Sequence, residues 1–275
     1  MTRVSSAETW LTLYCLPHAG GGARAYGRLQ AVVPRGVRAV PLELPGHGRR
    51  LRERPLRDID EVVTEVIRLM GDDRESQGER EDRDGRADSR AGRRFALFGH
   101  SFGALVGYET AWRLRGSGTS PELLLVSARN SPAWPLSHEP LHRLPDASFT
   151  SGLGRMGGIP QALLAEPAVM HVYLPSIRAD LRMVETYAHT HTEPLEVPVA
   201  AFAGLQDRLT DPEGMRAWAE RTSGGFDLTS LSGGHFFLGE PEFHRALSAR
   251  LDRLDRLGPP ERRPDGQPVE PGRRR

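Results

Sequence analysis

The chain has 275 residues, 38% of them hydrophobic, and a formal net charge of +1. This length suits one large α/β domain, and a net charge near zero gives no indication of bulk binding to nucleic acid. The single cysteine, Cys15, excludes an internal disulfide framework, and no apolar run approaches the ~18 residues of a membrane span. We therefore expect a cytoplasmic monomer that binds neither nucleic acid nor a membrane.

The first two predicted strands each end in a glycine-rich loop. An apolar strand over 11–16 is followed by Pro-His-Ala-Gly-Gly-Gly at 17–22, and a helix is expected over 23–33. A second strand over 37–44 is closed by Pro-Gly-His-Gly-Arg-Arg at 45–50. The first loop lacks both Gly-x-x-x-x-Gly-Lys-Ser/Thr and Gly-x-Gly-x-x-Gly, so it does not indicate a nucleotide site.

Residues 58–70 predict an amphipathic helix, because their apolar residues recur at helical spacing and Asp58 suits the N-cap. Residues 72–94 are nearly all charged or small, with two alanines as their only apolar residues. Because such a stretch has nothing to bury, we expect a disordered surface insertion. We expect the same of the Pro/Arg-rich tail at 258–275.

The most informative motif follows this charged stretch. Four apolar residues at 95–98 predict a buried strand, Gly99-His-Ser101-Phe-Gly103 comes next, and residues 104–115 predict a helix. A Gly-x-Ser-x-Gly motif between a strand and a helix is typical of a nucleophile elbow. The turn is so tight that the residues two positions on either side of the serine cannot carry a Cβ. Ser101 is therefore the candidate nucleophile.

The sheet pattern is interrupted between the strand predicted at 122–127 and the strand predicted at 197–203. Residues 129–191 contain Pro, Gly, Trp and short apolar pieces, with a helix predicted over 175–188. We interpret 129–191 as a mobile helical lid. Within it, Met156 and Leu163 are expected to line an acyl chamber. The alternative is an ordinary packed subdomain.

After the lid, the chain predicts a short helix over 215–221, a last strand over 226–231 and a final helix over 241–257. Strands alternating with helices predict a mostly parallel, doubly wound α/β sheet whose site lies at the carboxyl ends of the strands. We therefore expect one domain over 1–257.

Ser101, Asp207 and His235 occur in the chain order of the α/β-hydrolase catalytic triad. His235 can accept the serine proton because imidazole titrates near neutrality, and Asp207 would orient it. Asp211 competes with Asp207, but it precedes a proline and is typical of a helix N-cap. His100 is next to the serine and cannot turn to face its hydroxyl.

No metal site is expected. His189 and His191 are spaced like metal ligands, but no third ligand cluster accompanies them in the sequence.

Several segments together resemble the type II thioesterases, the discrete editing hydrolases of polyketide and non-ribosomal peptide synthesis. The similarity runs from about residue 10 to 251, and the segments that carry it are Leu-Pro-His-Ala-Gly-Gly at 16–21, Leu-Pro-Gly-His-Gly-Arg at 44–49, Leu-Phe-Gly-His-Ser-Phe-Gly at 97–103, Leu-Pro-Ser-Ile-Arg-Ala-Asp at 174–180 with Glu185 and Tyr187, and Gly-Gly-His-Phe-Phe-Leu at 233–238. The chain departs from the family at Phe102, where Met or Leu is more usual, and in its longer charged insertion.

The resemblance implies an α/β-hydrolase fold and a serine thioesterase. The backbone N–H groups of Ala19 and Phe102 would form the oxyanion hole. The substrate would be an acyl thioester on the phosphopantetheine arm of an acyl or peptidyl carrier protein, and no cofactor would be needed. The elbow and triad alone would equally permit a small-molecule esterase or lipase. A hydrolase-fold protein that only binds is the alternative from another class.

Overall fold

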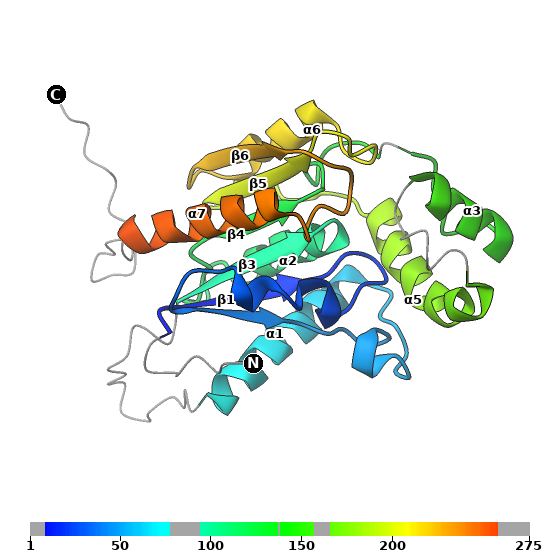
Figure 1. The fold of residues 1–275 in the computed structure, drawn as a ribbon, viewed down its shortest axis with the longest axis horizontal. Helices are drawn as coiled ribbons and strands as arrows, with labels where there is room; N and C mark the ends of the chain where they lie inside the picture. The colour runs from blue at the N-terminus through cyan, green and yellow to red at the C-terminus, as the bar shows by residue number, and fades with distance from the viewer. Residues whose placement is uncertain (1–8, 78–93, 137, 157–165, 258–275) are drawn as a thin grey trace.

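The strands form one six-stranded sheet in the order β2-β1-β3-β4-β5-β6, and every neighbouring pair is parallel (Figure 1). The computed structural model describes residues 9–77, 94–136, 138–156 and 166–257. The strands are β1 (Leu11–Leu16), β2 (Val37–Pro41), β3 (Phe95–His100), β4 (Leu124–Ser127), β5 (Val199–Gly204) and β6 (Phe226–Leu231). The predicted α/β class with a parallel sheet is confirmed.

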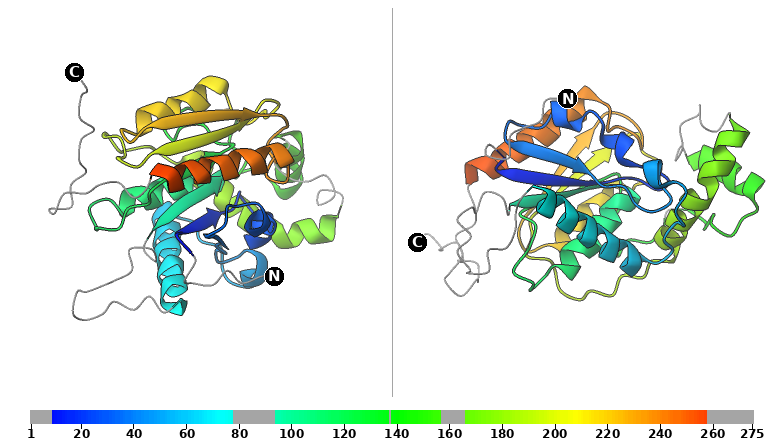
Figure 2. Two further views of the ribbon diagram at one scale, coloured as in Figure 1. Left: turned by 60° about the vertical axis from the view of Figure 1, so that its left-hand side comes forward. Right: turned by 90° about the horizontal axis from the view of Figure 1, so that it is seen from below.

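Helices cover both faces of this sheet. The helices are α1 (Ile59–Ser76), α2 (Phe102–Arg113), α3 (Asp146–Met156), α5 (Pro167–Thr186), α6 (Pro212–Arg216) and α7 (Pro241–Leu257), of which α3 and α5 belong to the insertion between β4 and β5. Alternate residues of each strand point to opposite faces, so Tyr14 and Leu16 of β1 join the core under α1 and α2, while Leu13 and Cys15 join the core under α7. The two further views in Figure 2 show α7 on the opposite side of the sheet from α1. None of the described helices combines the length and apolar character needed to cross a membrane.

Two predicted helices differ from those observed. The helix expected over 23–33 is a pair of short 3₁₀ turns, η2 (Ala23–Tyr26) and η3 (Leu29–Ala31). Its two buried residues, Tyr26 and Leu29, are three positions apart, which is the repeat of a 3₁₀ turn. The helix expected from residue 175 begins eight residues earlier, and Pro175 lies inside α5.

The charged insertion begins later than expected, because α1 continues past Met70 to Ser76. Asp73 on this last part of α1 accepts two hydrogen bonds from the Arg38 guanidinium, at 2.8 and 2.5 Å, and one from the Tyr14 hydroxyl at 3.1 Å. At the other end, Arg94 pairs with Glu122 through two hydrogen bonds of 2.8 and 2.7 Å. Residues 72–77 and 94 are thus part of the domain. The rest of the predicted insertion, 78–93, lies outside the described residues, as does the predicted tail.

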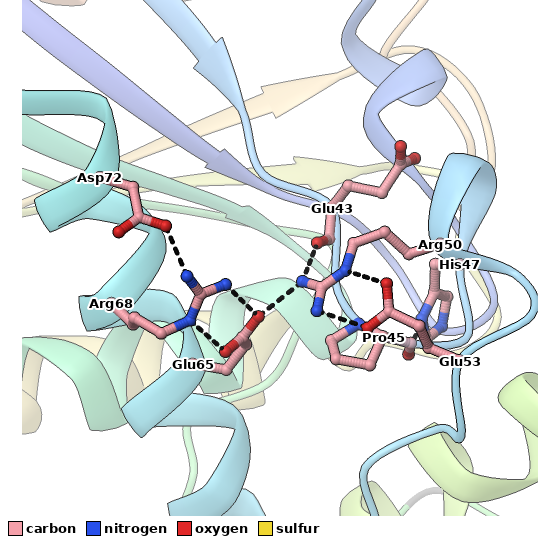
Figure 3. Close-up of polar contacts among 8 residues, drawn as sticks. All are labelled: Glu43, Pro45, His47, Arg50, Glu53, Glu65, Arg68 and Asp72. Carbon is pink, nitrogen blue, oxygen red and sulfur yellow. Dashed lines mark hydrogen bonds and ion pairs between the residues drawn. The ribbon is translucent and has the colours of Figure 1, made fainter. Parts of the chain in front are cut away.

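An ionic network attaches the loop after β2 to α1 (Figure 3). Arg50 binds Glu65 of α1 at 2.5 Å, Glu53 at 2.6 Å and the backbone carbonyl of Glu43 at 3.1 Å. Arg68 binds the same Glu65 at 2.8 Å. The network therefore fixes the loop that carries His47, and this loop reaches the site described below.

The insertion between β4 and β5 is helical, as predicted, and α3 and α5 project together beyond the sheet (Figure 1). It has an apolar cluster of its own, made of Leu141, Phe149, Leu153, Met170, Leu174, Ile177 and Leu181. The described part of the insertion is thus a packed unit. Leu163 and the side chain of Met156 lie outside the described residues, so their chamber role stays a prediction.

Candidate active site

The elbow at Ser101 has the strained geometry that its sequence predicts. Ser101 lies between β3 and α2 with φ 54° and ψ −113°, a combination that side-chain-bearing residues rarely adopt. A Cβ on Gly99 would lie 2.1 Å from the carbonyl oxygen of Gly103, and a Cβ on Gly103 would lie 2.0 Å from that of Leu16. Only glycine fits at either position. The serine is consequently held, partly exposed, at the carboxyl edge of the sheet.

Asp207 and His235 meet at the same edge. Asp207 follows β5 and His235 follows β6, and these strands pair in register up to Gly204 and Leu231. The His235 Nδ1 lies 2.9 Å from the Asp207 Oδ2. The other carboxylate oxygen, Oδ1, accepts the backbone N–H of Leu209 at 2.9 Å. Both side chains are almost fully buried, so the pair is fixed and shielded from water.

Asp211, the competitor of Asp207, faces away from this pair. Its side chain caps α6 by accepting the N–H groups of Glu213 and Gly214. The predicted N-cap is confirmed.

His235 lies against a group of aromatic rings around the elbow. Its ring centroid is 5.2 Å from that of His100, and the His18 ring is 5.0 Å from Phe236. Burial lowers the pKa of His18 to about 4 and lowers that of His100 well below its usual value; the positive charge of a protonated His235 lowers both further. Both neighbours are therefore neutral at pH 7. They do not compete with His235 for a proton, and they add no positive charge next to it.

The two expected oxyanion-hole residues lie just past the carboxyl ends of the adjacent strands β1 and β3. Leu16 of β1 is paired with Gly99 of β3, and Ala19 and Phe102 each come three residues after this pair. The Phe102 side chain is buried in the core, so only its backbone N–H could serve the predicted oxyanion hole. This N–H is also at the first turn of α2, where the helix dipole favours negative charge.

One buried carboxylate, which has no predicted role, joins the loops after β1 and β2 to α5. Asp180 of α5 accepts the backbone N–H of Gly20 at 2.8 Å and binds His47 Nε2 at 2.9 Å. Ser176, one turn earlier, donates to the carbonyl of Gly46. A single face of α5 thus binds both the loop after β1 and the loop after β2. The sequence feature that could have indicated this role is the position of Asp180, an acidic residue on the apolar face of a predicted helix.

A second lid carboxylate, Glu185, holds the segment in front of α3. It accepts the backbone N–H groups of Leu141 and His142 at 2.8 and 2.9 Å, and the His142 ring lies 2.6 Å from it. Its side chain is fully buried. The lid is therefore joined internally by polar contacts as well as by its apolar cluster.

The paired histidines of the segment before β5 are used structurally. His189 Nε2 is 3.0 Å from the Tyr108 hydroxyl, and His191 stacks on Trp112 with ring centroids 4.2 Å apart. Within the ranges that the structure describes, no group of three or more His, Cys, Asp or Glu side chains could hold a metal ion.

Comparison with known proteins gives the family. The model of the thioesterase domain family matches residues 11–78 and 86–251. Gramicidin S biosynthesis protein GrsT of Aneurinibacillus migulanus is 31% identical, over 88% of this chain and 93% of its own length. Thioesterase PikA5 of Streptomyces venezuelae is 33% identical, over 94% and 85%.

A solved structure agrees with these relatives. The type II thioesterase BorB from the borrelidin biosynthetic cluster superposes with a TM-score of 0.74 at 32% identity, covering 90% of this chain and 93% of BorB. The elbow, the buried His–Asp pair and these matches lead to one conclusion, that the chain belongs to the thioesterase domain family.

Proposed function

We propose that the chain hydrolyses acyl thioesters from the phosphopantetheine arms of carrier proteins in polyketide or non-ribosomal peptide synthesis. The observation that carries the proposal is the buried Asp207–His235 pair at the sheet edge where the elbow presents Ser101. The names of two relatives support the pathway, because one is a gramicidin S biosynthesis protein and the other is a type II thioesterase from the borrelidin biosynthetic cluster. The reaction needs only the groups of the protein, the substrate and water.

In the first step the Ser101 hydroxyl oxygen attacks the thioester carbonyl while His235 Nε2 takes the hydroxyl proton. Asp207 accepts the Nδ1–H of His235, which leaves Nε2 free as the base and stabilises the imidazolium that forms. The backbone N–H groups of Ala19 and Phe102 donate to the developing oxyanion, a contribution typically worth about 10²–10³ in rate per donor. The intermediate then collapses, His235 returns the proton to sulfur, and the carrier thiol leaves.

In the second step water hydrolyses the ester on Ser101. His235 removes a proton from the water as it attacks the acyl carbonyl, and then gives that proton to the Ser101 oxygen as the acid is released. The neutral state of His18 and His100 matters in both steps, since a charged neighbour would lower the basicity of His235.

The test is turnover of a panel of acyl-carrier thioesters by the wild type and by Ser101→Ala. We expect the variant to lose at least about 10⁴-fold in kcat. A fluorophosphonate probe should label Ser101 in the wild type and leave the variant unlabelled. A p-nitrophenyl ester of the same acyl group distinguishes the esterase alternative. Faster turnover of that ester than of every carrier thioester would contradict the proposed substrate class.

A further inference from the structure

Arg129, two residues past β4, is a cation with no counterion among the described residues. Among the residues that the structure describes, its guanidinium has no ion pair, hydrogen bond or aromatic ring partner, whereas Arg94 near the opposite end of the sheet has Glu122. The backbone of Arg129 is fixed, because its carbonyl accepts the Trp218 Nε1–H at 2.7 Å. The direction of the chain is set by Ala128, which has a positive φ of 51°.

The Arg129 side chain lines a cavity of about 320 Å³. Trp134, Leu136 and Val184 form apolar parts of its wall, and Tyr187 and His189 add polar groups. None of the described residues that line this cavity is acidic.

The nearest carboxylate on α2 is already used. Glu109 accepts the Tyr187 hydroxyl at 2.5 Å and binds His191 Nε2 at 3.0 Å, and it does not line the cavity. Burial lowers the pKa of Arg129 to about 10, so the guanidinium still carries its charge at neutral pH. A partly buried charge without a counterion is costly, and a bound anion would offset that cost.

Arg129 comes close to the elbow at the carboxyl edge of the sheet, although Ser101, Asp207 and His235 do not line the cavity. The backbone N–H of Ser101 donates to the carbonyl of Ser127 at 2.8 Å, and Arg129 is only two residues further along. Consecutive Cα atoms are about 3.8 Å apart, so the Cα atoms of Ser127 and Arg129 are at most about 8 Å apart. The opposite wall belongs to α5 and the residues just after it, through Val184 and Tyr187. The cavity is thus between the carboxyl edge of the sheet and the lid.

We propose that Arg129 binds an oxyanion of the substrate in this cavity, either a carboxylate on the acyl group or the phosphate of the pantetheine arm. The inference rests on the proposed thioesterase function. A guanidinium can bind a carboxylate or a phosphate through two parallel hydrogen bonds. Trp134 and Leu136 pack against the apolar part of the same substrate.

The experiment compares the wild type with Arg129→Met on two pairs of small thioesters. The first pair, butyryl and glutaryl N-acetylcysteamine, differs by a carboxylate on the acyl group. The second pair, butyryl-pantetheine and butyryl-phosphopantetheine, differs by the phosphate. Arg182→Gln is the control for the loss of an arginine, because Arg182 is exposed on α5, the helix that forms the opposite wall of the cavity.

We expect Arg129→Met to lower kcat/KM for the anionic member of one pair by about 10- to 100-fold, and for the neutral members by less than about 2-fold. A selective loss with glutaryl identifies the acyl carboxylate, and a selective loss with phosphopantetheine identifies the arm. Arg129→Lys should restore part of the preference. Equal losses on all four substrates, no loss on any, or the same loss in Arg182→Gln would overturn the proposal.

Thermal unfolding of the same variants separates binding from a structural role. Because the free protein has no counterion for Arg129 among its described residues, Arg129→Met should keep or raise the melting temperature. A large fall in melting temperature would overturn the proposal. Wild-type hydrolysis of the neutral butyryl thioesters reports the proposed function separately, so failure of one idea is distinguishable from failure of the other.

Discussion

At Ser101, strain in the backbone is retained because the surrounding packing leaves no alternative. The positive φ of this serine is held between Gly99 and Gly103, and an added Cβ at either glycine would overlap a backbone carbonyl. Strain of this kind typically costs about 1–3 kcal/mol and is concentrated at functional sites. The cost is met by a β3 strand whose six residues are all buried.

Asp207 and Asp211 are expected to have different roles, one in catalysis and one in stability. We predict that Asp207→Asn lowers kcat by about 10³–10⁴-fold with little loss of stability, because the amide favours the wrong tautomer of His235. Asp211→Ala should instead lower the free energy of unfolding by about 1 kcal/mol, as for a lost N-cap, with kcat nearly unchanged. Steady-state kinetics and urea unfolding of both variants check this. The reverse pattern would assign the orienting role to Asp211.

Among the elements, α5 has the widest reach, because Asp180 binds both the Gly20 N–H of the candidate oxyanion loop and the His47 ring. We predict that Asp180→Asn lowers kcat by about 10-fold or more while KM changes little, because Asp180 contacts the Gly20 loop and His47 and not the substrate. It should also destabilise by about 1.5–3 kcal/mol, as for a charge-assisted hydrogen bond. Asp146→Asn is the control, because Asp146 is an exposed lid carboxylate paired with Arg178.

The pH dependence of that loss has a definite sign. Burial disfavours the protonated ring of His47, but the hydrogen bond and charge of Asp180 outweigh it and raise the pKa of His47 above its usual 6.5. Stability from a raised pKa is fully present below the unfolded value and is lost as pH rises through the folded value. The stability lost in Asp180→Asn should therefore be larger at pH 6 than at pH 9. An equal loss at both would exclude the charged pair.

Helix α1 offers a test of the opposite sign. The hydrogen bond from Arg68 lowers the pKa of Glu65 to about 2; burial opposes this, and Arg50 adds to the lowering. Stability from a depressed pKa is present above the unfolded value near 4.5 and is lost as pH falls toward about 2. Glu65→Gln should cost about 1–2 kcal/mol at pH 7 and almost nothing at pH 2, measured by denaturant unfolding. Glu75→Gln, on the exposed end of α1, should cost little at either pH.

For the molecule as a whole, the free energy of unfolding of two deletions can locate the boundaries of the charged insertion. We predict that replacing residues 78–93 by a short Gly-Ser linker changes the free energy of unfolding by less than about 1 kcal/mol, because loop length contributes weakly. Replacing 72–94 should cost about 2–4 kcal/mol, since it removes the contacts of Asp73 and Arg94.

Urea unfolding of the two deletions checks this boundary, and KM for a carrier-bound thioester and for a small thioester should stay unchanged in the shorter deletion. A rise in KM for the carrier-bound substrate alone would show instead that 78–93 takes part in docking.

The features that could be predicted from the sequence are local or periodic. The alternation of strands and helices, the Gly-x-Ser-x-Gly turn and the N-caps at Asp58 and Asp211 each depend on residues within a few positions of one another, and each is found in the structure. The sequence also predicted that Ser101, Asp207 and His235 lie at one edge of the sheet, because each follows a parallel strand and the carboxyl ends of parallel strands meet at one edge.

The contacts between groups that are distant in the chain could not be predicted from the sequence. Helix α1 extends to Ser76 because Asp73 finds Arg38 and Tyr14, which lie 35 and 59 residues away in the chain. Asp180 reaches Gly20 across 160 residues. Arg129 has no counterion among the described residues and lines a cavity, whereas Arg50 and Arg94 are each paired with a glutamate. Such pairings depend on how whole helices and strands are placed relative to one another. Hydrophobic periodicity predicts which face of a helix or strand is buried, but it does not predict which polar group of another element will lie against that face.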